Sequence, residues 1–220
     1  MGAVLAKLLA AMSCKVIINF QYSLEDASHL KNEIISEGGS VELWQGDIFD
    51  LNWLNTKKEE LIAKGQSLDI LILNACQPPH ALLFNASTIS RINTYISRNF
   101  ELTSVPLALF SPMINEYRGY EVIISSEYVI HPKREFTQYV ILKTAIESLV
   151  SSMAYKYDHI KWRVVRPPKM LTDMSNSPMG NHDASDPVLI AKNICEHIFI
   201  NNIDRNSNFE IFSPQLQSRL

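Results

Sequence analysis

Glycine is scarce in this sequence, with only seven among 220 residues. Because glycine allows tight turns and close approach of the backbone to a ligand, its scarcity leaves few positions for such features. Cysteine is scarce too: Cys14, Cys76 and Cys195 lie far apart, and none has a second cysteine or histidine at metal-ligand spacing. These spacings exclude a disulfide framework and a structural zinc site, and they favour a reducing compartment.

Charge of one sign and long apolar runs are absent as well. The net charge is −3, with no basic or acidic run, so nothing indicates nucleic acid or an anionic membrane surface as a partner. No window reaches the roughly 18 apolar residues that a membrane span needs. Near the N-terminus, Lys7 interrupts the apolar residues, which recur at helical spacing through 4–12. We therefore favour an amphipathic helix over an export signal, and we expect a soluble, cytoplasmic protein.

The order of hydrophobic patterns predicts alternating strands and helices in one domain over residues 1–220. Strand-like apolar runs alternate with segments of helical period. Ser23 is the expected N-cap of one helix, and Asp186 followed by a proline opens the last helix. The expected strands are 14–20, 40–47, 68–75, 120–126, 160–167 and 208–212, and the expected helices are 23–38, 51–64, 87–118, 139–157 and 187–199.

This alternation predicts a doubly wound, Rossmann-like parallel sheet with helices on both faces, because strands that are nearly all apolar must be covered on both sides. Ligands of such folds bind beyond the carboxyl ends of the strands. The polar loop over residues 173–186 is long enough to serve as a substrate lid at that edge.

Residues 123–143 place a strand ending in serines ahead of a helix that carries Tyr139 and Lys143. A phenol is a poor acid or base near neutral pH unless a neighbouring cation favours its anion. Lys143 lies one helical turn after Tyr139 on the same face, so its ammonium is expected to lower the pKa of the phenol. The same spacing occurs at Tyr157 and Lys161, but no strand-borne serine precedes that copy.

These residues resemble the catalytic motif of the short-chain dehydrogenase/reductase family, and the resemblance runs over nearly the whole chain. Ser126 precedes Tyr139 at the family's serine-to-tyrosine spacing, and Asn99 falls where the family keeps a helical asparagine. The resemblance implies that Tyr139 transfers a proton with the substrate oxygen and that Ser126 fixes this oxygen. Lys143 would lower the pKa of the phenol and hold the nicotinamide ribose, while Asn99 would hold a water in the proton relay.

The cofactor-binding motifs are similar to those of the family in the same order along the chain. "LDILILNAC" resembles the strand that ends in Asn-Asn-Ala-Gly, with Asn74 and Ala75 retained, and Asp47 matches the strand-end aspartate that contacts adenine. "RPPKMLTDM" resembles the Pro-Gly-x-x-x-Thr segment, with Pro167 and Thr172 retained. The resemblance therefore implies a nicotinamide cofactor bound along these strand ends.

The N-terminus departs from the family pattern, which begins with a strand and a Thr-Gly-x-x-x-Gly-x-Gly turn. Met1-Gly2 fits the last two positions of that turn, and the following apolar residues continue its helix. The first strand and most of the phosphate-binding loop are missing, and Cys76 and Pro168 replace two further glycines. Since the missing strand is central in the family, its neighbours are expected to lose backbone partners unless they close up or borrow a strand. The chain is then either a fragment of a longer protein or one with a damaged cofactor site.

Two hypotheses for the function remain open. In the first, the chain is an NAD(P)-dependent oxidoreductase acting on a carbonyl or alcohol, such as a ketoreductase domain of a larger biosynthetic enzyme. In the second, it is a catalytically silent scaffold of the same fold. NADP is mildly preferred over NAD, because "NFQYS" supplies no acidic residue after the second strand of the family fold. A homodimer or homotetramer is implied by the resemblance alone.

Overall fold

Strands and helices alternate along the chain as the sequence predicts. The computed structural model describes residues 1–172, 183–201 and 207–214, so most of the predicted loop over 173–186 lies outside the described residues. The strands are β1 (Lys15–Phe20), β2 (Ser40–Gln45), β3 (Ile70–Leu73), β4 (Tyr120–Ile124), β5 (Lys161–Val165) and β6 (Phe209–Phe212). The helices are α1 (Gly2–Ala11), α2 (Leu24–Ser36), α3 (Leu51–Ala63), α4 (Ile89–Tyr117), α5 (Thr137–Lys156) and α6 (Pro187–Cys195), with a 3-10 turn η1 (Glu127–Val129) and a π-helical turn η3 (Glu196–Asn201).

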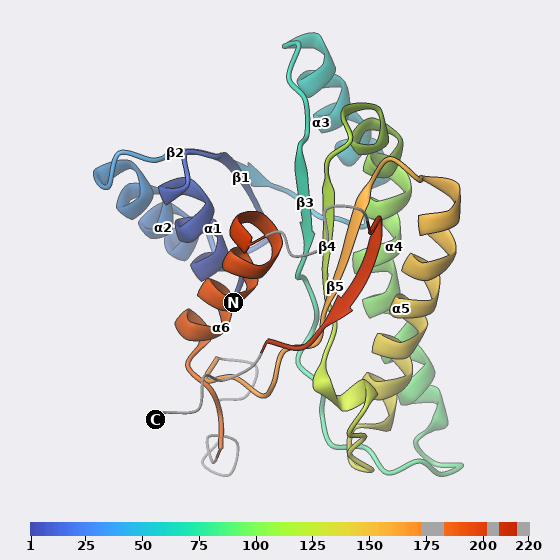
Figure 1. Ribbon diagram of the computed structural model, residues 1–220. Helices are drawn as coiled ribbons and strands as arrows, with labels where there is room; N and C mark the ends of the chain where they lie inside the picture. The colour runs from blue at the N-terminus through green and yellow to red at the C-terminus, as the bar shows by residue number, and fades with distance from the viewer. Residues whose placement is uncertain (173–182, 202–206, 215–220) are drawn as a thin grey trace.

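All neighbouring strands are parallel, which confirms the predicted fold class, but they form two sheets. One sheet has the order β1-β2 and the other has the order β3-β4-β5-β6 (Figure 1). Within the described residues, β1 pairs only with β2, and β3 pairs only with β4. The two strands that were expected to lose a partner have therefore not closed up, and each has an open edge.

Helix α1 joins the two sheets through two different apolar faces. Leu5 belongs to a buried cluster with Val122 and Ile124 of β4, against which Ile70 and Ile72 of β3 also pack. On its other face, α1 contributes Ala6 and Ala10 to a cluster with helix α2 and strands β1 and β2. In addition, Ile17 of β1 and Trp44 of β2 pack in the core that contains Leu73 of β3. These apolar contacts explain why the two sheets stay associated without a shared backbone ladder.

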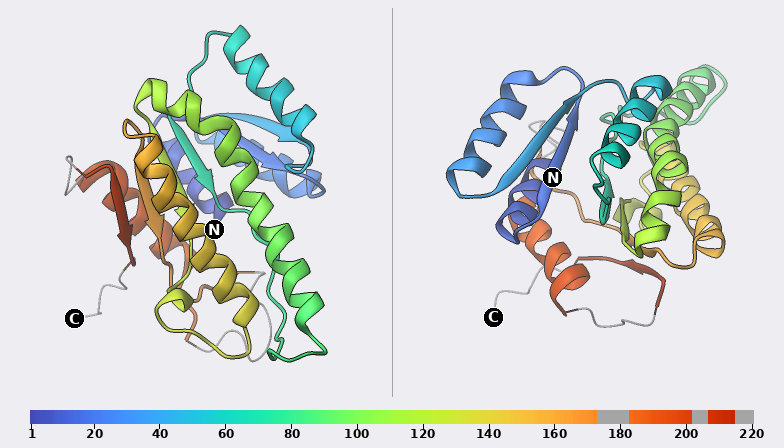
Figure 2. Two further views of the ribbon diagram at one scale, coloured as in Figure 1. Left: turned by 90° about the vertical axis from the view of Figure 1, so that its right-hand side faces the viewer. Right: turned by 90° about the horizontal axis from the view of Figure 1, so that it is seen from above.

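The opposite face of the four-stranded sheet is covered by α4 and α5, which run side by side (Figure 2). Successive residues of β4 point to opposite faces of the sheet, as the pleat requires. Ile123 packs with Leu142 and Ile146 of α5, whereas Ile124 packs on the α1 and α6 side. Both faces of β4 are thus buried, and its carboxyl end is held between α5 and α6.

Two of the helices begin where the sequence places a capping aspartate. The Asp50 carboxylate accepts hydrogen bonds from the N–H groups of Asn52 and Trp53, both at 3.0 Å. The Asp186 carboxylate accepts one from the Val188 N–H at 2.8 Å, and Pro187 takes the first helical position. Ser23 precedes α2 as predicted, but its hydroxyl makes no capping hydrogen bond.

Gly119 sits at the tightest backbone approach in the sheet, immediately before β4. A Cβ added there would lie 2.3 Å from the Asp69 carbonyl oxygen, which cannot move away because it accepts the Tyr120 N–H at 2.8 Å. We expect Gly119→Ala to lower the free energy of unfolding by about 3 kcal/mol, as overpacking against backbone does. Urea denaturation measures this change.

Gly65→Ala is the matched control for this prediction. Gly65 has a φ of +63° and no atom within 4 Å of an added Cβ, so only backbone strain of about 1 kcal/mol is expected. Equal decreases in the free energy of unfolding of the two variants would show that the contact with Asp69 is not the reason for glycine at position 119.

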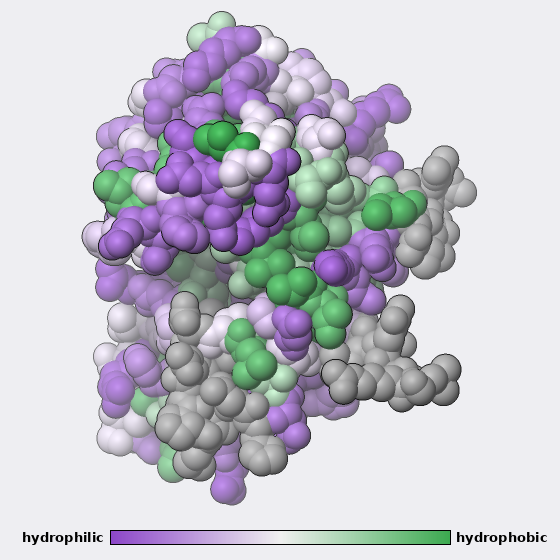
Figure 3. Space-filling model, turned by 90° about the vertical axis from the view of Figure 1, so that its left-hand side faces the viewer, coloured by the Kyte–Doolittle hydropathy of each residue, from purple (hydrophilic) through white to green (hydrophobic). Residues whose placement is uncertain are grey.

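Apolar side chains also reach the surface on the face formed by the N-terminal helices and α6. Figure 3 shows them gathered across the middle of this face. On α6, Val188 and Leu189 are exposed, the latter to 56%. No helix among the described residues is long and apolar enough to cross a membrane.

Candidate active site

The carboxyl ends of the strands bring most of the predicted site residues to one edge of the fold. Asp47 follows β2, Asn74 and Ala75 follow β3, Ser126 follows β4 and Pro167 follows β5. Because all the strands are parallel, their carboxyl ends lie at the same edge, as expected for a doubly wound sheet.

Tyr139, Lys143 and Ser126 meet at the carboxyl end of β4. Helix α5 places the Lys143 ammonium 5.5 Å from the centre of the Tyr139 ring, and the Ser126 hydroxyl contacts the Tyr139 phenol. Lys143 is buried, with 4% of its surface exposed, and it donates a hydrogen bond of 2.7 Å to the Ile124 carbonyl oxygen. Ser126 also accepts the Tyr128 N–H at 3.2 Å, which fixes the hydroxyl at the start of η1. The structure therefore brings the three predicted catalytic side chains together.

The electrostatics of this cluster differ from the sequence-based expectation. Burial raises the pKa of Tyr139, and the contact with Ser126 opposes this rise. Burial also lowers the pKa of Lys143, while Cys76 and Glu147 oppose that fall. The expectation of a lowered phenol pKa is therefore wrong, because burial disfavours the charged form of both groups.

Asn99 lies in the same region, but its side chain forms hydrogen bonds with backbone groups. It is 1% exposed on α4, accepts the Gln77 N–H at 2.6 Å and donates to the Tyr95 carbonyl oxygen at 2.8 Å. The Tyr95 hydroxyl donates to the Gln77 carbonyl oxygen at 2.8 Å and lies 3.8 Å from the Cys76 sulfur. Asn99 therefore anchors the loop after β3, and this loop carries Cys76 toward Tyr139.

A buried polar network behind the cluster was not predicted from the sequence. The Ser125 hydroxyl donates to Glu147 Oε1 at 2.5 Å, and Arg166 donates to Glu147 through Nε at 3.0 Å and Nη2 at 2.7 Å. A signal for it was present, because Glu147 lies one further helical turn after Lys143 on the same face of α5. The contacts with Ser125 and Arg166, however, depend on how α5 packs against two strand ends.

Gly2 and Asn74, two residues predicted to bind the cofactor, lie against each other. A Cβ added at Gly2 would lie 2.9 Å from Asn74 Nδ2, so glycine is what allows this approach of α1 to the end of β3. The first N–H groups of a helix have no intrahelical partner and are suited to bind an anion. The N–H groups at the start of α1, next to Asn74, could therefore bind an anion.

The remaining predicted residues lie along the same edge. Asp47 accepts the Gln21 side-chain amide at 2.6 Å and the Phe49 N–H at 3.0 Å. Ala75 is exposed, and the Pro167 carbonyl oxygen accepts the Glu127 N–H at 3.0 Å. Thr172 ends the described part of the following loop and donates its N–H to the Met170 carbonyl oxygen at 2.9 Å.

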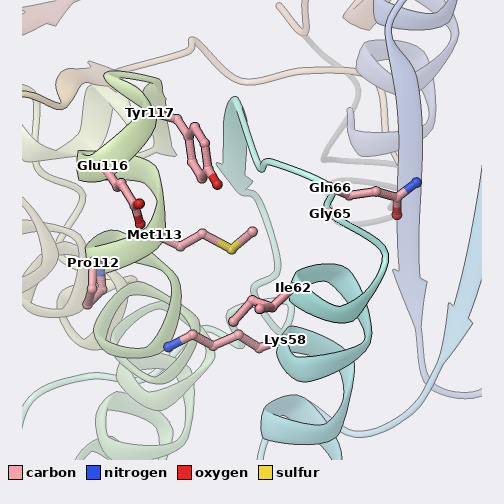
Figure 4. Close-up of a pocket in the computed structure, with 8 residues that line it drawn as sticks. All are labelled: Lys58, Ile62, Gly65, Gln66, Pro112, Met113, Glu116 and Tyr117. Atoms are coloured by element: carbon pink, nitrogen blue, oxygen red, sulfur yellow. The ribbon is translucent and has the colours of Figure 1, made fainter.

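A surface pocket of about 370 Å³ lies elsewhere, between α3 and the last turns of α4 (Figure 4). Lys58, Met113 and Tyr117 point toward the space between these two helices, whereas the Gln66 amide points away from it. Gln66 precedes β3 and Tyr117 precedes β4, so the pocket lies at the amino ends of these strands. It is therefore remote from the cluster around Tyr139.

Comparisons with known proteins agree with this fold. The family model described as short chain dehydrogenase matches residues 1–181, and the chain belongs to this family. Its members are NAD(P)-dependent oxidoreductases that act on small-molecule substrates.

Solved structures share the fold at low sequence identity. An alcohol dehydrogenase from the archaeon Thermococcus sibiricus, complexed with 5-hydroxy-NADP, is 15% identical with a TM-score of 0.82, covering 96% of this chain and 90% of that chain. A dehydrogenase/reductase from Sinorhizobium meliloti 1021 is 20% identical with a TM-score of 0.82, covering 96% of this chain and 88% of that one.

Proposed function

We propose that this protein transfers a hydride between a nicotinamide cofactor and a carbonyl or alcohol substrate, with Tyr139 as the proton donor or acceptor. The observation that carries the proposal is the meeting of Tyr139, Lys143 and Ser126 at the carboxyl end of β4. No one of these residue types is specific by itself, but a phenol, an ammonium and a hydroxyl at one strand end match the needs of proton transfer to a substrate oxygen.

Each side chain has a distinct role in this proposal. The cofactor would supply or accept the hydride. Tyr139 would exchange a proton with the substrate oxygen, Ser126 would orient that oxygen, and Lys143 would favour the phenolate by its charge. Asn99 would keep the loop after β3 in place, and any relay water would have to bind beside its committed amide.

The residues at the strand ends fit a dinucleotide at its nicotinamide side and part of its phosphate side. Asn74, Ala75, Pro167 and Thr172 would line the nicotinamide half, and Asp47 would lie at the adenine half. Gly2 at the start of α1 supports one wall of the phosphate site. The open edges of β1 and β3 beside this wall favour the second candidate, a silent scaffold, for residues 1–220 by themselves.

Further parts of the proposal concern cofactor, assembly and location. NADP is preferred over NAD, because β1 is followed by Gln21 and Tyr22 and not by an acidic residue. Exposed apolar side chains on α4 and α5, such as Tyr117, Ile141 and Tyr155, support a homodimer or homotetramer. We also propose a single-domain cytoplasmic protein, for which the three cysteines without disulfides are the support.

Calorimetric titration with NADPH and NADH tests the cofactor part of the proposal. Residues 1–220 are expected to bind both weakly, with NADPH the tighter ligand. A version extended ahead of Met1 by a strand and a Thr-Gly-x-x-x-Gly turn is expected to bind NADPH at least about tenfold more tightly, since each hydrogen bond to a charged phosphate contributes about 1.5–3 kcal/mol.

Oxidation of NADPH by a panel of ketones and β-keto thioesters, followed by absorbance, tests the reaction itself. Turnover by the extended version supports the oxidoreductase. Tight binding without turnover of any substrate would favour the silent scaffold, and equal micromolar affinity of the two versions would contradict the role given to the turn.

A further inference from the structure

We propose that Glu147 is a positioning residue, which, bound by Ser125 and Arg166, holds Ser126 and Lys143 in place beside Tyr139. This inference rests on the proposed function, because it assigns Glu147 to the same reaction. It concerns a side chain that lies behind the cluster, where it does not reach the phenol of Tyr139.

The geometry that carries the proposal is a pair of hydrogen bonds between α5 and the end of β4. Lys143 donates to the Ile124 carbonyl oxygen at 2.7 Å, and Glu147, one turn further along α5, accepts from Ser125 at 2.5 Å. Two turns of α5 are therefore bonded to the two residues that directly precede Ser126. Of these two bonds, the one to Glu147 is also anchored from a second strand end.

Arg166 provides that second anchor at the end of β5. Its guanidinium binds both carboxylate oxygens of Glu147, and its backbone N–H donates to the Phe212 carbonyl oxygen at 2.9 Å. The Ser125 N–H donates to the Val165 carbonyl oxygen at 2.7 Å, so both partners of Glu147 are fixed by the sheet. A bidentate pair of this kind constrains direction as well as distance. Glu147 thus sets how far α5 can slide or rotate against the strand end that carries Ser126.

Glu147 also acts on Lys143 by its charge. The groups that bear on the Lys143 ammonium are Cys76 from the loop after β3, with Tyr139 and Glu147 on α5 itself. Burial lowers the pKa of Lys143, and the Glu147 carboxylate counteracts this effect, while Arg166 neutralises part of the carboxylate charge. The network is therefore placed to keep the buried lysine protonated, as the proposed role of Lys143 requires.

A second arginine–glutamate ion pair in the chain provides a matched control. Arg163 of β5 lies 3.2 Å from the Glu210 carboxylate of β6, and its side chain is 3% exposed. Glu210 is not among the groups that act on the charge of Lys143, and the other ionic partner of Glu210 is His197, at 2.8 Å. Glu210→Gln thus breaks a comparable pair with a purely structural effect expected.

The experiment follows the ionisation of Lys143 directly, in residues 1–220 labelled with ε-13C-lysine. The Lys143 resonance is assigned by its loss in Lys143→Arg, and its pH titration is compared among variants by NMR. Glu147→Gln is expected to lower the pKa of Lys143, and Arg166→Gln is expected to raise it, because the carboxylate then acts without its guanidinium. Glu147→Asp, which keeps the charge, is expected to restore most of the unaltered titration, and Glu210→Gln to leave it unchanged.

Opposite changes in the first two variants support the proposal, because general destabilisation cannot move one pKa in both directions. An unchanged Lys143 titration in both variants, or equal changes in Glu210→Gln, overturns it. If Glu147→Gln does not fold, Arg166→Gln alone tests the proposal: a raised pKa of Lys143 supports it, and an unchanged or lowered pKa overturns it.

Kinetics separate this inference from the function on which it rests. In the extended version, Glu147→Gln is expected to lower kcat about 10- to 100-fold, as small misplacements of reacting groups do, with the alkaline limb of the pH profile moved to lower pH. Turnover that is insensitive to Glu147 overturns the positioning role alone. Absence of turnover in every version, together with opposite titration changes, counts against the proposed function alone.

Discussion

Tyr139→Phe is expected to lower turnover by about 10²- to 10⁴-fold, the contribution of a positioned acid or base. The substitution removes only the hydroxyl, so the fold and the cofactor affinity should persist. Lys143→Ala is expected to cause a similar loss and to weaken cofactor binding as well, because it removes the charge that favours the phenolate. Since the two residues act together, the double variant should be little worse than either single one. Oxidation of NADPH by the extended version measures all three.

The second Tyr-x-x-x-Lys pair provides the control for this experiment. Tyr157 follows the last residue of α5, and Lys161 opens β5, where its ammonium donates to the Tyr120 hydroxyl at 3.3 Å. The pair is therefore split between two elements and lies away from Ser126. Tyr157→Phe should leave turnover unchanged. If Tyr139→Phe keeps the rate of the unaltered extended protein, Tyr139 is not the proton-transfer residue.

Glu121→Gln is expected to make the protein less sensitive to alkali, because Glu121 is a buried carboxyl in the middle of the sheet. It is fully buried on β4, and neither carboxylate oxygen has a hydrogen-bond partner. The Ser111 hydroxyl lowers the pKa of Glu121 and so partly opposes the effect of burial. It donates its hydrogen bond to the Leu107 carbonyl oxygen at 2.5 Å. Burial raises the pKa of Glu121 from 4.5 to about 8.

The direction in which stability changes with pH depends on the pH at which Glu121 loses its proton in the unfolded and in the folded chain. Between pH 4.5 and about 8 the unfolded chain loses the Glu121 proton while the folded chain keeps it, so the free energy of unfolding falls as pH rises. The slope is at most about 1.4 kcal/mol per pH unit. Between pH 5 and pH 8, the free energy of unfolding of Glu121→Gln should therefore rise by about 3 kcal/mol relative to that of the unaltered protein.

Urea denaturation across that pH range measures the difference between the two proteins. Glu116→Gln is the control, since Glu116 is an exposed glutamate near the end of α4. Its stability should change with pH in parallel with the unaltered protein. Parallel curves for Glu121→Gln as well would mean that Glu121 is already ionised in the folded state.

The sequence predicted the elements of the fold because their patterns are local. The apolar run before Ser126 became β4, Asp186 capped its helix as predicted, and the prolines inside α4 did not end it. What local patterns could not predict is the division into two sheets. Whether strands with a missing neighbour close up depends on packing, and here apolar packing of α1, Ile17 and Trp44 keeps the two sheets associated without a ladder.

The candidate site was predictable in its composition but not in its electrostatics. The spacing of Tyr139 and Lys143, one helical turn, predicted that they share a face of α5, and the resemblance to the family implied that Ser126 joins them. The pKa of Tyr139 was predicted with the wrong sign, since the degree of burial is a property of the folded structure. The partners of Glu147 come from two strands, and nothing in the sequence pairs Ser125 with Arg166.

The division into two sheets also bears on how the protein opens. Among the described residues, no strand of the β1-β2 sheet shares a ladder with the four-stranded sheet, so the smaller sheet can separate without breaking a rung of the larger. Leu5 packs on the larger sheet, while Ala6 and Ala10 pack on the smaller. Ile17 of β1 and Trp44 of β2 also pack in the core that contains Leu73 of β3. The two sheets are therefore coupled through apolar side chains of α1 and of these strands, and we expect the smaller sheet to open as a cooperative unit of its own.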